Sequence, residues 1–79
     1  MYNWTEQNNK LQKTYKFNTF IDAINWMQKA SVKVDELDHH PEWTNIYNKV
    51  HVTLSTHDVG NIITDKDREL AKVLDAVEQ

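Results

Sequence analysis

The chain has 79 residues, of which 39% are hydrophobic, with no cysteine and a formal net charge of -3 at pH 7. These values exclude disulfide bonds and zinc sites built on thiolates, and no apolar run approaches the roughly 18 residues of a membrane-spanning helix. We therefore expect one cytoplasmic domain over residues 1–79. Because so small a chain buries only about 60% of its unfolded surface, we expect a homodimer or homotetramer.

The charge is divided unevenly along the sequence. Residues 1–33 carry five lysines against two acidic side chains, whereas residues 34–79 carry four basic against ten acidic side chains. Nucleic-acid binding requires a concentrated basic face, so this distribution argues against a nucleic-acid partner. It is compatible with a neutral small-molecule ligand or with self-association between unlike faces.

The first 17 residues predict a β-hairpin. Residues 4–7 and 11–17 are expected to form two strands around the turn-forming pair Asn8-Asn9. Lys13 interrupts the apolar face of the second strand, and lysines are also typical of a partly exposed strand at the edge of a sheet.

A helix is predicted from about Thr19 to about Glu36. Thr19 is a suitable N-cap residue, and apolar side chains recur behind it at the spacing of one helical face. The predicted stripe comprises Phe20, Ala23, Ile24, Met27, Ala30, Ser31 and Val34. Trp26 falls off the centre of this stripe, so it either contacts a partner subunit or lies flat on the edge of the core.

A second hairpin is predicted after Pro41, which prevents the helix from continuing. A short strand over residues 43–47 leads through Asn48-Lys49 into a longer strand over residues 50–56. Apolar and polar residues alternate in the longer strand, which therefore has one face for the core and one polar face.

The last quarter of the sequence predicts a loop and a second helix. The loop covers residues 58–63, and Thr64 with Asp67 forms a Thr-x-x-Asp capping box at the start of the helix. The order of elements is strand, strand, helix, strand, strand, helix. This order predicts an α+β fold, a four-stranded antiparallel sheet with both helices packed on one face.

All four histidines lie between residues 39 and 57, which suggests proton transfer or metal binding. Adjacent histidines in an extended segment point to opposite sides, so His39 and His40 cannot easily bind one ion, and we expect no metal. Ser55 and His57 share a strand face, but no nucleophile elbow surrounds them. General acid–base catalysis by histidine fits better, with an inert polar surface as the competing interpretation.

The spacing allows one cleft. His39 or His40 from the turn after the first helix and His57 from the end of the long strand can converge there. Asp35 and Asp67 can orient these rings or tune their protonation. Aromatic side chains nearby suggest a planar substrate.

Three motifs carry a family resemblance. They are Leu37-Asp38-His39-His40-Pro41-Glu42-Trp43, Tyr47-Asn48-Lys49-Val50-His51 and Leu54-Ser55-Thr56-His57, framed by Asp35 and Asp67. The pattern resembles the pterin-4a-carbinolamine dehydratases, and the similarity extends from Trp4 onward. On this resemblance the chain is a short form that lacks the N-terminal helix of the family.

The resemblance implies that 4a-hydroxytetrahydrobiopterin is dehydrated to quinonoid 6,7-dihydropterin, a step of tetrahydrobiopterin recycling. It implies no cofactor, because the pterin is the substrate. It implies His39 and His57 as the catalytic acid–base pair and His40 as a catalytic-site residue that is the main substrate contact. The other positions of the candidate binding site are Asp35, Asp38, Trp43, Ser55, Thr56, Asp58 and Asp67.

Some assignments stay open. Asp67 is either a site residue or only a helix-cap residue, and Asp35 stands where the family often has glutamate, which is one methylene longer. The loop between His57 and Asp67 is one residue longer than in animal members. His51 is expected to be a polar strand residue and not a catalyst. The alternative function is a non-catalytic pterin-binding or protein-binding regulatory module, because animal relatives also act as dimerisation cofactors of a homeodomain transcription factor.

Overall fold

The fold consists of one sheet and two helices, described for residues 3–77 by a computed structural model. The elements in chain order are β1 (Thr5–Gln7), β2 (Lys10–Lys16), α1 (Phe20–Leu37), β3 (Glu42–Ile46), β4 (Lys49–Leu54), the 3-10 helix η1 (His57–Val59) and α2 (Asp65–Ala76). The predicted order of strands and helices is confirmed. Only η1 lies where the sequence predicted an irregular loop.

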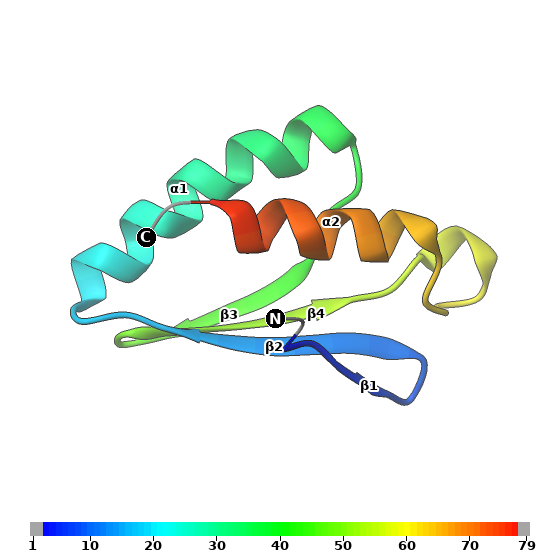
Figure 1. Ribbon diagram of the computed structural model, residues 1–79, viewed down its shortest axis with the longest axis horizontal. Coiled ribbons are helices and arrows are strands. Elements are labelled where there is room, and N and C mark those ends of the chain that lie inside the picture. Colours follow the sequence, from blue (N-terminus) through cyan, green and yellow to red (C-terminus); the bar gives the residue numbers. More distant parts are fainter. Residues whose placement is uncertain (1–2, 78–79) are drawn as a thin grey trace.

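The strands form a single antiparallel sheet. Their order is β1-β2-β4-β3, and every neighbouring pair is antiparallel. Figure 1 shows α1 and α2 on the same side of the sheet. The predicted α+β fold, with both helices on one face of a four-stranded antiparallel sheet, is therefore confirmed.

The two faces of the sheet differ in chemistry. Toward the helices, β4 presents Val50, Val52 and Leu54, which are at most 1% exposed. On the opposite face Thr14 of β2 is paired with His51 of β4, and the Thr14 hydroxyl lies 2.7 Å from His51 Nδ1. His51 thus lies on the polar face, as the alternation of β4 predicts.

Trp26 belongs to the core, which corrects both alternatives expected for it, a contact with a partner subunit and a flat position on the edge of the core. It is 1% exposed, and its ring centroid lies 4.4 Å from that of Tyr15 and 5.6 Å from that of Phe17. The buried residues of α1 are Ala23, Trp26, Ala30 and Val34. The small alanines let the helix approach the sheet closely, and the Trp26 ring fills the space between the two layers. The helix is rotated accordingly, so that Phe20 is exposed.

The turn of the second hairpin lies one residue earlier than predicted. Ile46 pairs with Lys49, so the loop is Tyr47-Asn48 and not Asn48-Lys49. Asn48 is held by Phe17, since the Phe17 N–H donates to the Asn48 carbonyl and the Asn48 side chain donates to the Phe17 carbonyl, both at 2.8 Å. This tertiary contact, which local turn preferences do not include, leaves Tyr47 with a positive φ of 53°.

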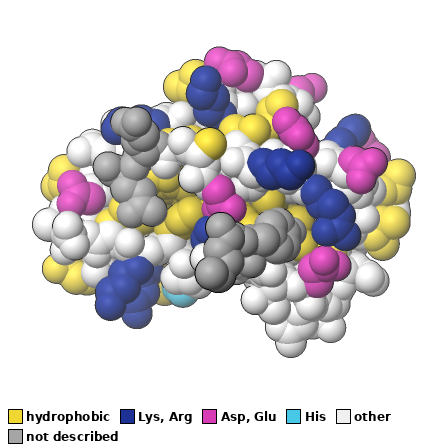
Figure 2. Space-filling view, in the orientation of Figure 1, with side chains coloured by type: hydrophobic (Ala, Val, Ile, Leu, Met, Phe, Trp, Pro, Cys, Tyr) yellow, Lys and Arg dark blue, Asp and Glu magenta, His cyan; other side chains and the backbone are white. Residues whose placement is uncertain are grey.

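The surface carries charges of both signs. Figure 2 shows basic and acidic side chains interspersed over the visible face, so the described residues form no concentrated basic patch there. Neither helix of residues 3–77 has the length and apolar character needed to cross a membrane.

Candidate functional site

Helix α1 ends in a way that separates the two adjacent histidines. Asp38 adopts a left-handed conformation with a φ of 52°, and its N–H donates to the Asp35 carbonyl at 3.2 Å. Pro41 favours an extended conformation for His40 before it, in which successive side chains point to opposite sides. The His39 side chain is directed toward α2 and is 14% exposed, whereas the His40 side chain is 60% exposed.

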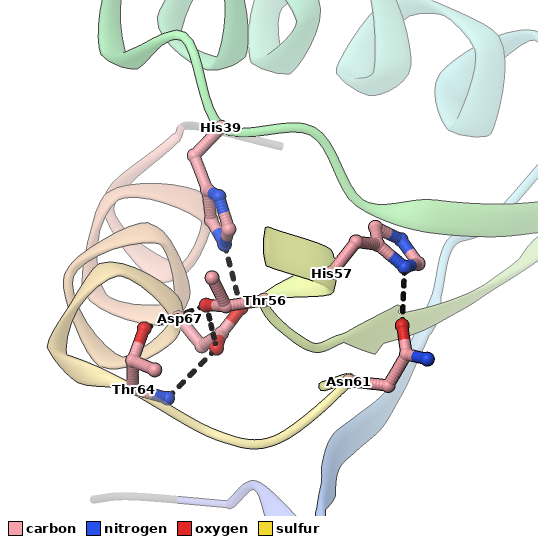
Figure 3. Close-up of polar contacts among 6 residues, drawn as sticks. All are labelled: His39, Thr56, His57, Asn61, Thr64 and Asp67. Atoms are coloured by element: carbon pink, nitrogen blue, oxygen red, sulfur yellow. Dashed lines mark hydrogen bonds and ion pairs between the residues drawn. The ribbon is translucent and has the colours of Figure 1, made fainter. Parts of the chain in front are cut away.

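The carboxylate of Asp67, in the first turn of α2, is the centre of a buried network (Figure 3). The side chain is fully buried, and its Oδ1 lies 2.6 Å from His39 Nε2. Its Oδ2 accepts hydrogen bonds from the Thr56 hydroxyl at 2.8 Å and from the Thr64 N–H at 2.9 Å. Asp67 is therefore not only a helix-cap residue, since one oxygen caps α2 and the other holds a histidine.

The network determines where its protons lie. Burial alone would raise the pKa of Asp67, but its hydrogen bonds, with that from His39 the largest, outweigh burial and lower this pKa below its usual value. Asp67 is thus ionised near neutral pH, and a carboxylate only accepts hydrogen bonds. His39 Nε2 must therefore donate, so that in the neutral form of the ring it is Nδ1 that carries no proton.

The two threonines complete the network. Thr56 gives its one hydroxyl proton to Asp67, so the Thr64 hydroxyl, 2.6 Å away, donates to Thr56 Oγ1. Every acceptor position that Asp67 uses is filled from a different segment of the chain. Such an arrangement fixes the carboxylate and, through it, the orientation of the His39 ring.

His57 comes from the loop that follows β4. This strand ends at Leu54, two residues earlier than predicted, and the Thr56 N–H instead donates to the Ile62 carbonyl at 2.8 Å. His57 is exposed at the start of η1, and its Nδ1 lies 2.5 Å from Asn61 Oδ1. The preceding residue, Thr56, bonds Asp67, so His57 directly follows a member of the His39 network in the chain, while its ring is turned toward Asn61 (Figure 3).

His40 and His39 line two different surface hollows. His40 Nε2 lies 3.9 Å from Asp35 Oδ1, and both side chains are among those that line a surface groove of about 610 Å³ together with Trp43. His39 and Asp38 line a second hollow of about 480 Å³ near the start of α2. The segment between Asp38 and Trp43 thus passes between two hollows.

Comparison with known proteins decides the family. A sequence model described as pterin 4 alpha carbinolamine dehydratase matches residues 1–77 of this chain. The chain belongs to this dehydratase family. A Prochlorococcus marinus protein provisionally named as a pterin-4-alpha-carbinolamine dehydratase is 50% identical over 74 residues, which cover 94% of this chain and 76% of the relative. A provisionally named dehydratase of Sulfolobus acidocaldarius is 43% identical over 75 residues, covering 95% and 81%.

Two solved structures share the dehydratase fold. A transcriptional coactivator/pterin dehydratase of Brucella melitensis superimposes with a TM-score of 0.88 at 36% identity, covering 96% of this chain and 82% of that one. A pterin dehydratase-like protein that is a RuBisCO assembly factor in the alpha-carboxysome has a TM-score of 0.79 at 22% identity, covering 94% and 87%. At that identity the second likeness concerns the fold alone.

The remaining candidate residues of this dehydratase-family chain differ in exposure. Asp58 is exposed in η1, whereas Ser55 is 6% and Thr56 4% exposed. Within residues 3–77, no three His, Asp or Glu side chains are grouped so that they could hold one metal ion.

The sequence does not predict the contact of Asn61 with His57 or that of Thr56 with Thr64. The sequence predicts only a loop at Asn61. Its position four residues after His57 and directly after Gly60 is nevertheless a usable signal, because Asn and Gly both tolerate a left-handed turn that reverses the chain. Thr64 was recognised as a helix cap. Its contact with Thr56 could not be predicted, because no periodic pattern in the sequence connects these two positions.

Proposed function

We propose that the protein dehydrates 4a-hydroxytetrahydrobiopterin to quinonoid 6,7-dihydropterin in tetrahydrobiopterin recycling. The observation that carries this proposal is the fully buried Asp67 carboxylate, which holds the His39 ring beside the loop of His57. Membership of the dehydratase family supports the substrate class. No cofactor is required, because the pterin itself is the substrate.

The reaction needs one acid and one base. The bond between C4a and the hydroxyl oxygen breaks as an acid protonates the oxygen, and water leaves. The N5 proton passes to a base, and the electrons of the N–H bond form the new double bond between N5 and C4a. Imidazole can take either part near neutral pH, and we assign these parts to His39 and His57 as a pair.

Apart from Ser55, which is buried directly after the end of β4, the other candidate residues divide into two groups. The carboxylate of Asp67 and the hydroxyl of Thr56 are buried and already bonded, so we assign them to the positioning of His39 and not to direct contact with the pterin. The negative charge of Asp67 can also stabilise positive charge that develops on the His39 ring. Surface positions remain for contact with substrate, with His40 as the main one. They are Asp35, Asp38, His40, Trp43 and Asp58.

The test is the rate of carbinolamine dehydration by the purified protein. We expect His39→Ala and His57→Ala each to lower kcat by roughly 10² to 10⁴, the usual contribution of one general acid or base. His51→Ala is the matched control, because His51 lies on the polar face of the sheet and bonds Thr14. Its rate should stay within about twofold of the unmutated protein. An unmutated protein no faster than buffer would contradict the proposal and favour a non-catalytic pterin-binding or protein-binding module.

We also propose that the chain assembles as a homodimer or homotetramer. Four large apolar side chains, Phe20, Ile21, Ile46 and Tyr47, are 45% to 67% exposed. They lie at one end of the molecule, where the contact between Phe17 and Asn48 joins the start of α1 to the hairpin turn. Light scattering at micromolar concentration should give two or four times the chain mass, and a stable monomer would contradict this assembly.

A further inference from the structure

The loop after β4 is closed on itself. The Thr56 N–H donates to the Ile62 carbonyl at 2.8 Å, and the Asn61 N–H donates back to the Thr56 carbonyl at 3.0 Å. Within this closure the Gly60 N–H donates to the His57 carbonyl at 3.2 Å. The backbone positions of His57 and Asn61 are therefore fixed relative to each other by hydrogen bonds that involve neither side chain.

Asn61 holds an unusual backbone conformation in this loop. Its φ is 61°, and Gly60 before it has a φ of 86°, so two consecutive residues are left-handed. Glycine adopts this conformation without steric cost, and asparagine tolerates it better than most other residues. The result is that the Asn61 side chain turns back toward the His57 ring (Figure 3), where its Oδ1 lies 2.5 Å from Nδ1.

The contact has a chemical consequence for the ring. An amide oxygen only accepts a hydrogen bond, so Nδ1 of His57 must carry a proton. In the neutral ring the base is then Nε2, on the side away from Asn61. His39 is held in the opposite sense, because its Nε2 faces Asp67 and its Nδ1 is free. The partner of His39 is a carboxylate, whereas the partner of His57 is an uncharged amide.

We propose that Asn61 is a positioning residue that holds His57 in the Nδ1–H tautomer and presents Nε2 to the pterin. The inference rests on the function proposed above for His57, and it extends that function to a residue that does not touch the reacting atoms. The amide fixes the ring and its tautomer without placing a charge beside it. The two histidines of the site are thereby oriented by different means, one by a buried charge and one by a surface amide.

The test uses two substitutions that keep the backbone. Asn61→Gly removes the amide but accepts a left-handed conformation, and Asn61→Asp keeps an acceptor oxygen at the same position. The matched control is Asn8→Gly, which replaces another left-handed asparagine in a turn far along the chain. Asn45→Gly would not serve, because Asn45 lies in β3. Thermal unfolding of each variant shows whether the fold is retained.

The first readout is the tautomer of His57 without substrate, measured from the ¹⁵N and ¹³C shifts of the imidazole ring. We expect the Nδ1–H form to dominate in the unmutated protein, in Asn61→Asp and in Asn8→Gly, and to lose its dominance in Asn61→Gly. An unmutated protein with Nε2–H as the main form, or an Asn61→Gly variant with an unchanged tautomer, would overturn the inference whatever the activity.

The second readout is the dehydration rate. We expect kcat to fall about tenfold in Asn61→Gly with little change in KM, as is usual for partners that orient a functional histidine, and to be largely restored in Asn61→Asp. A changed tautomer with an unchanged rate would leave the contact of Asn61 standing and overturn the catalytic role proposed for His57. The two proposals can therefore fail separately.

Discussion

Helix α2 carries a bonded aspartate at each end, and the two differ in what they hold. Asp67 in the first turn receives hydrogen bonds from His39, the Thr56 hydroxyl and the Thr64 N–H. Asp75 in the last turn is bonded to three side chains of the N-terminal segment. They are the Trp4 indole at 3.0 Å, the Lys13 ammonium at 2.6 Å and the Tyr15 hydroxyl at 2.5 Å.

The two aspartates differ in whether the side chain bonded to them keeps a second nitrogen that can act as a base. Lys13 and Tyr15 use their polar groups on Asp75, and the Lys13 ammonium also lies 4.7 Å from the centroid of the Tyr15 ring. This cluster therefore attaches α2 to the sheet and offers no free base. The His39 ring, by contrast, has two nitrogens, and Asp67 occupies only one of them. An aspartate carboxylate can therefore stabilise the fold or, as proposed for His39, orient a catalytic side chain, depending on its partner.

The largest expected effect comes from Asp67→Asn. An amide at this position can donate to His39 Nε2 and so favours the wrong tautomer, with Nδ1 protonated. We expect kcat for carbinolamine dehydration to fall on the order of 10² to 10³. Stopped-flow measurement of the dehydration step checks this. A variant that is as active as the unmutated protein would show that Asp67 is a structural residue like Asp75.

The same substitution at the other end of the helix is the matched comparison. Asp75→Asn weakens the bonds from Lys13 and Tyr15, so we expect the free energy of unfolding to fall by about 1–3 kcal/mol. Activity at a temperature well below unfolding should stay within about twofold. Urea unfolding and the dehydration assay measure the two quantities. A large loss of kcat in this folded variant would contradict the division of roles.

The two clusters should also respond differently to pH. Burial tends to raise the pKa of Asp67 and of Asp75, but hydrogen bonds, the first from His39 and Lys13 respectively, lower both below the usual value of 3.8. Their contributions to stability are therefore fully present above about pH 4 and are lost as pH falls through the lowered values. Asp75→Asn should accordingly lose less stability on acidification than the unmutated protein.

The Asp75 cluster, unlike the Asp67 network, should also lose stability at alkaline pH, because it contains Tyr15. Burial, and then the contact with Asp75, raise the pKa of Tyr15 above its usual value of 10.0. Its contribution is thus complete below pH 10 and is lost as pH rises further. Chemical unfolding at a series of pH values should show a smaller alkaline loss in Tyr15→Phe than in the unmutated protein. Equal losses in both would remove Tyr15 from this account.

The smallest effect is expected at an exposed ion pair between α2 and the sheet. Arg68 of α2 lies 3.3 Å from Glu6 of β1, and both side chains are about half exposed. Solvent screens such a pair, so Glu6→Gln should change the free energy of unfolding by less than about 0.5 kcal/mol. A change as large as that of Asp75→Asn would mean that the attachment of α2 to the sheet is not concentrated at Asp75.

The sequence by itself determined the order of the elements and the two faces of β4. Alternation in β4 and the capping box of α2 are local patterns, so the strand faces and the start of the helix could be predicted. The motif around His39 and His40 is also local, since its residues are contiguous in the sequence, and it therefore indicated the family. Lys13 was a misfit in this scheme, and only the structure supplies its partner on the last turn of α2.

Tertiary structure alone decided which groups meet. The sequence places Trp26 off the centre of the helix stripe, but close packing against Tyr15 and Phe17 buries it in the core. The bond of Asp67 to His39 spans 28 positions of the sequence, and no periodic pattern encodes such a separation. The tautomers of the two candidate histidines follow from contacts of this kind. Side-chain identity sets which atoms can donate or accept, and only the folded chain sets which of them come within reach.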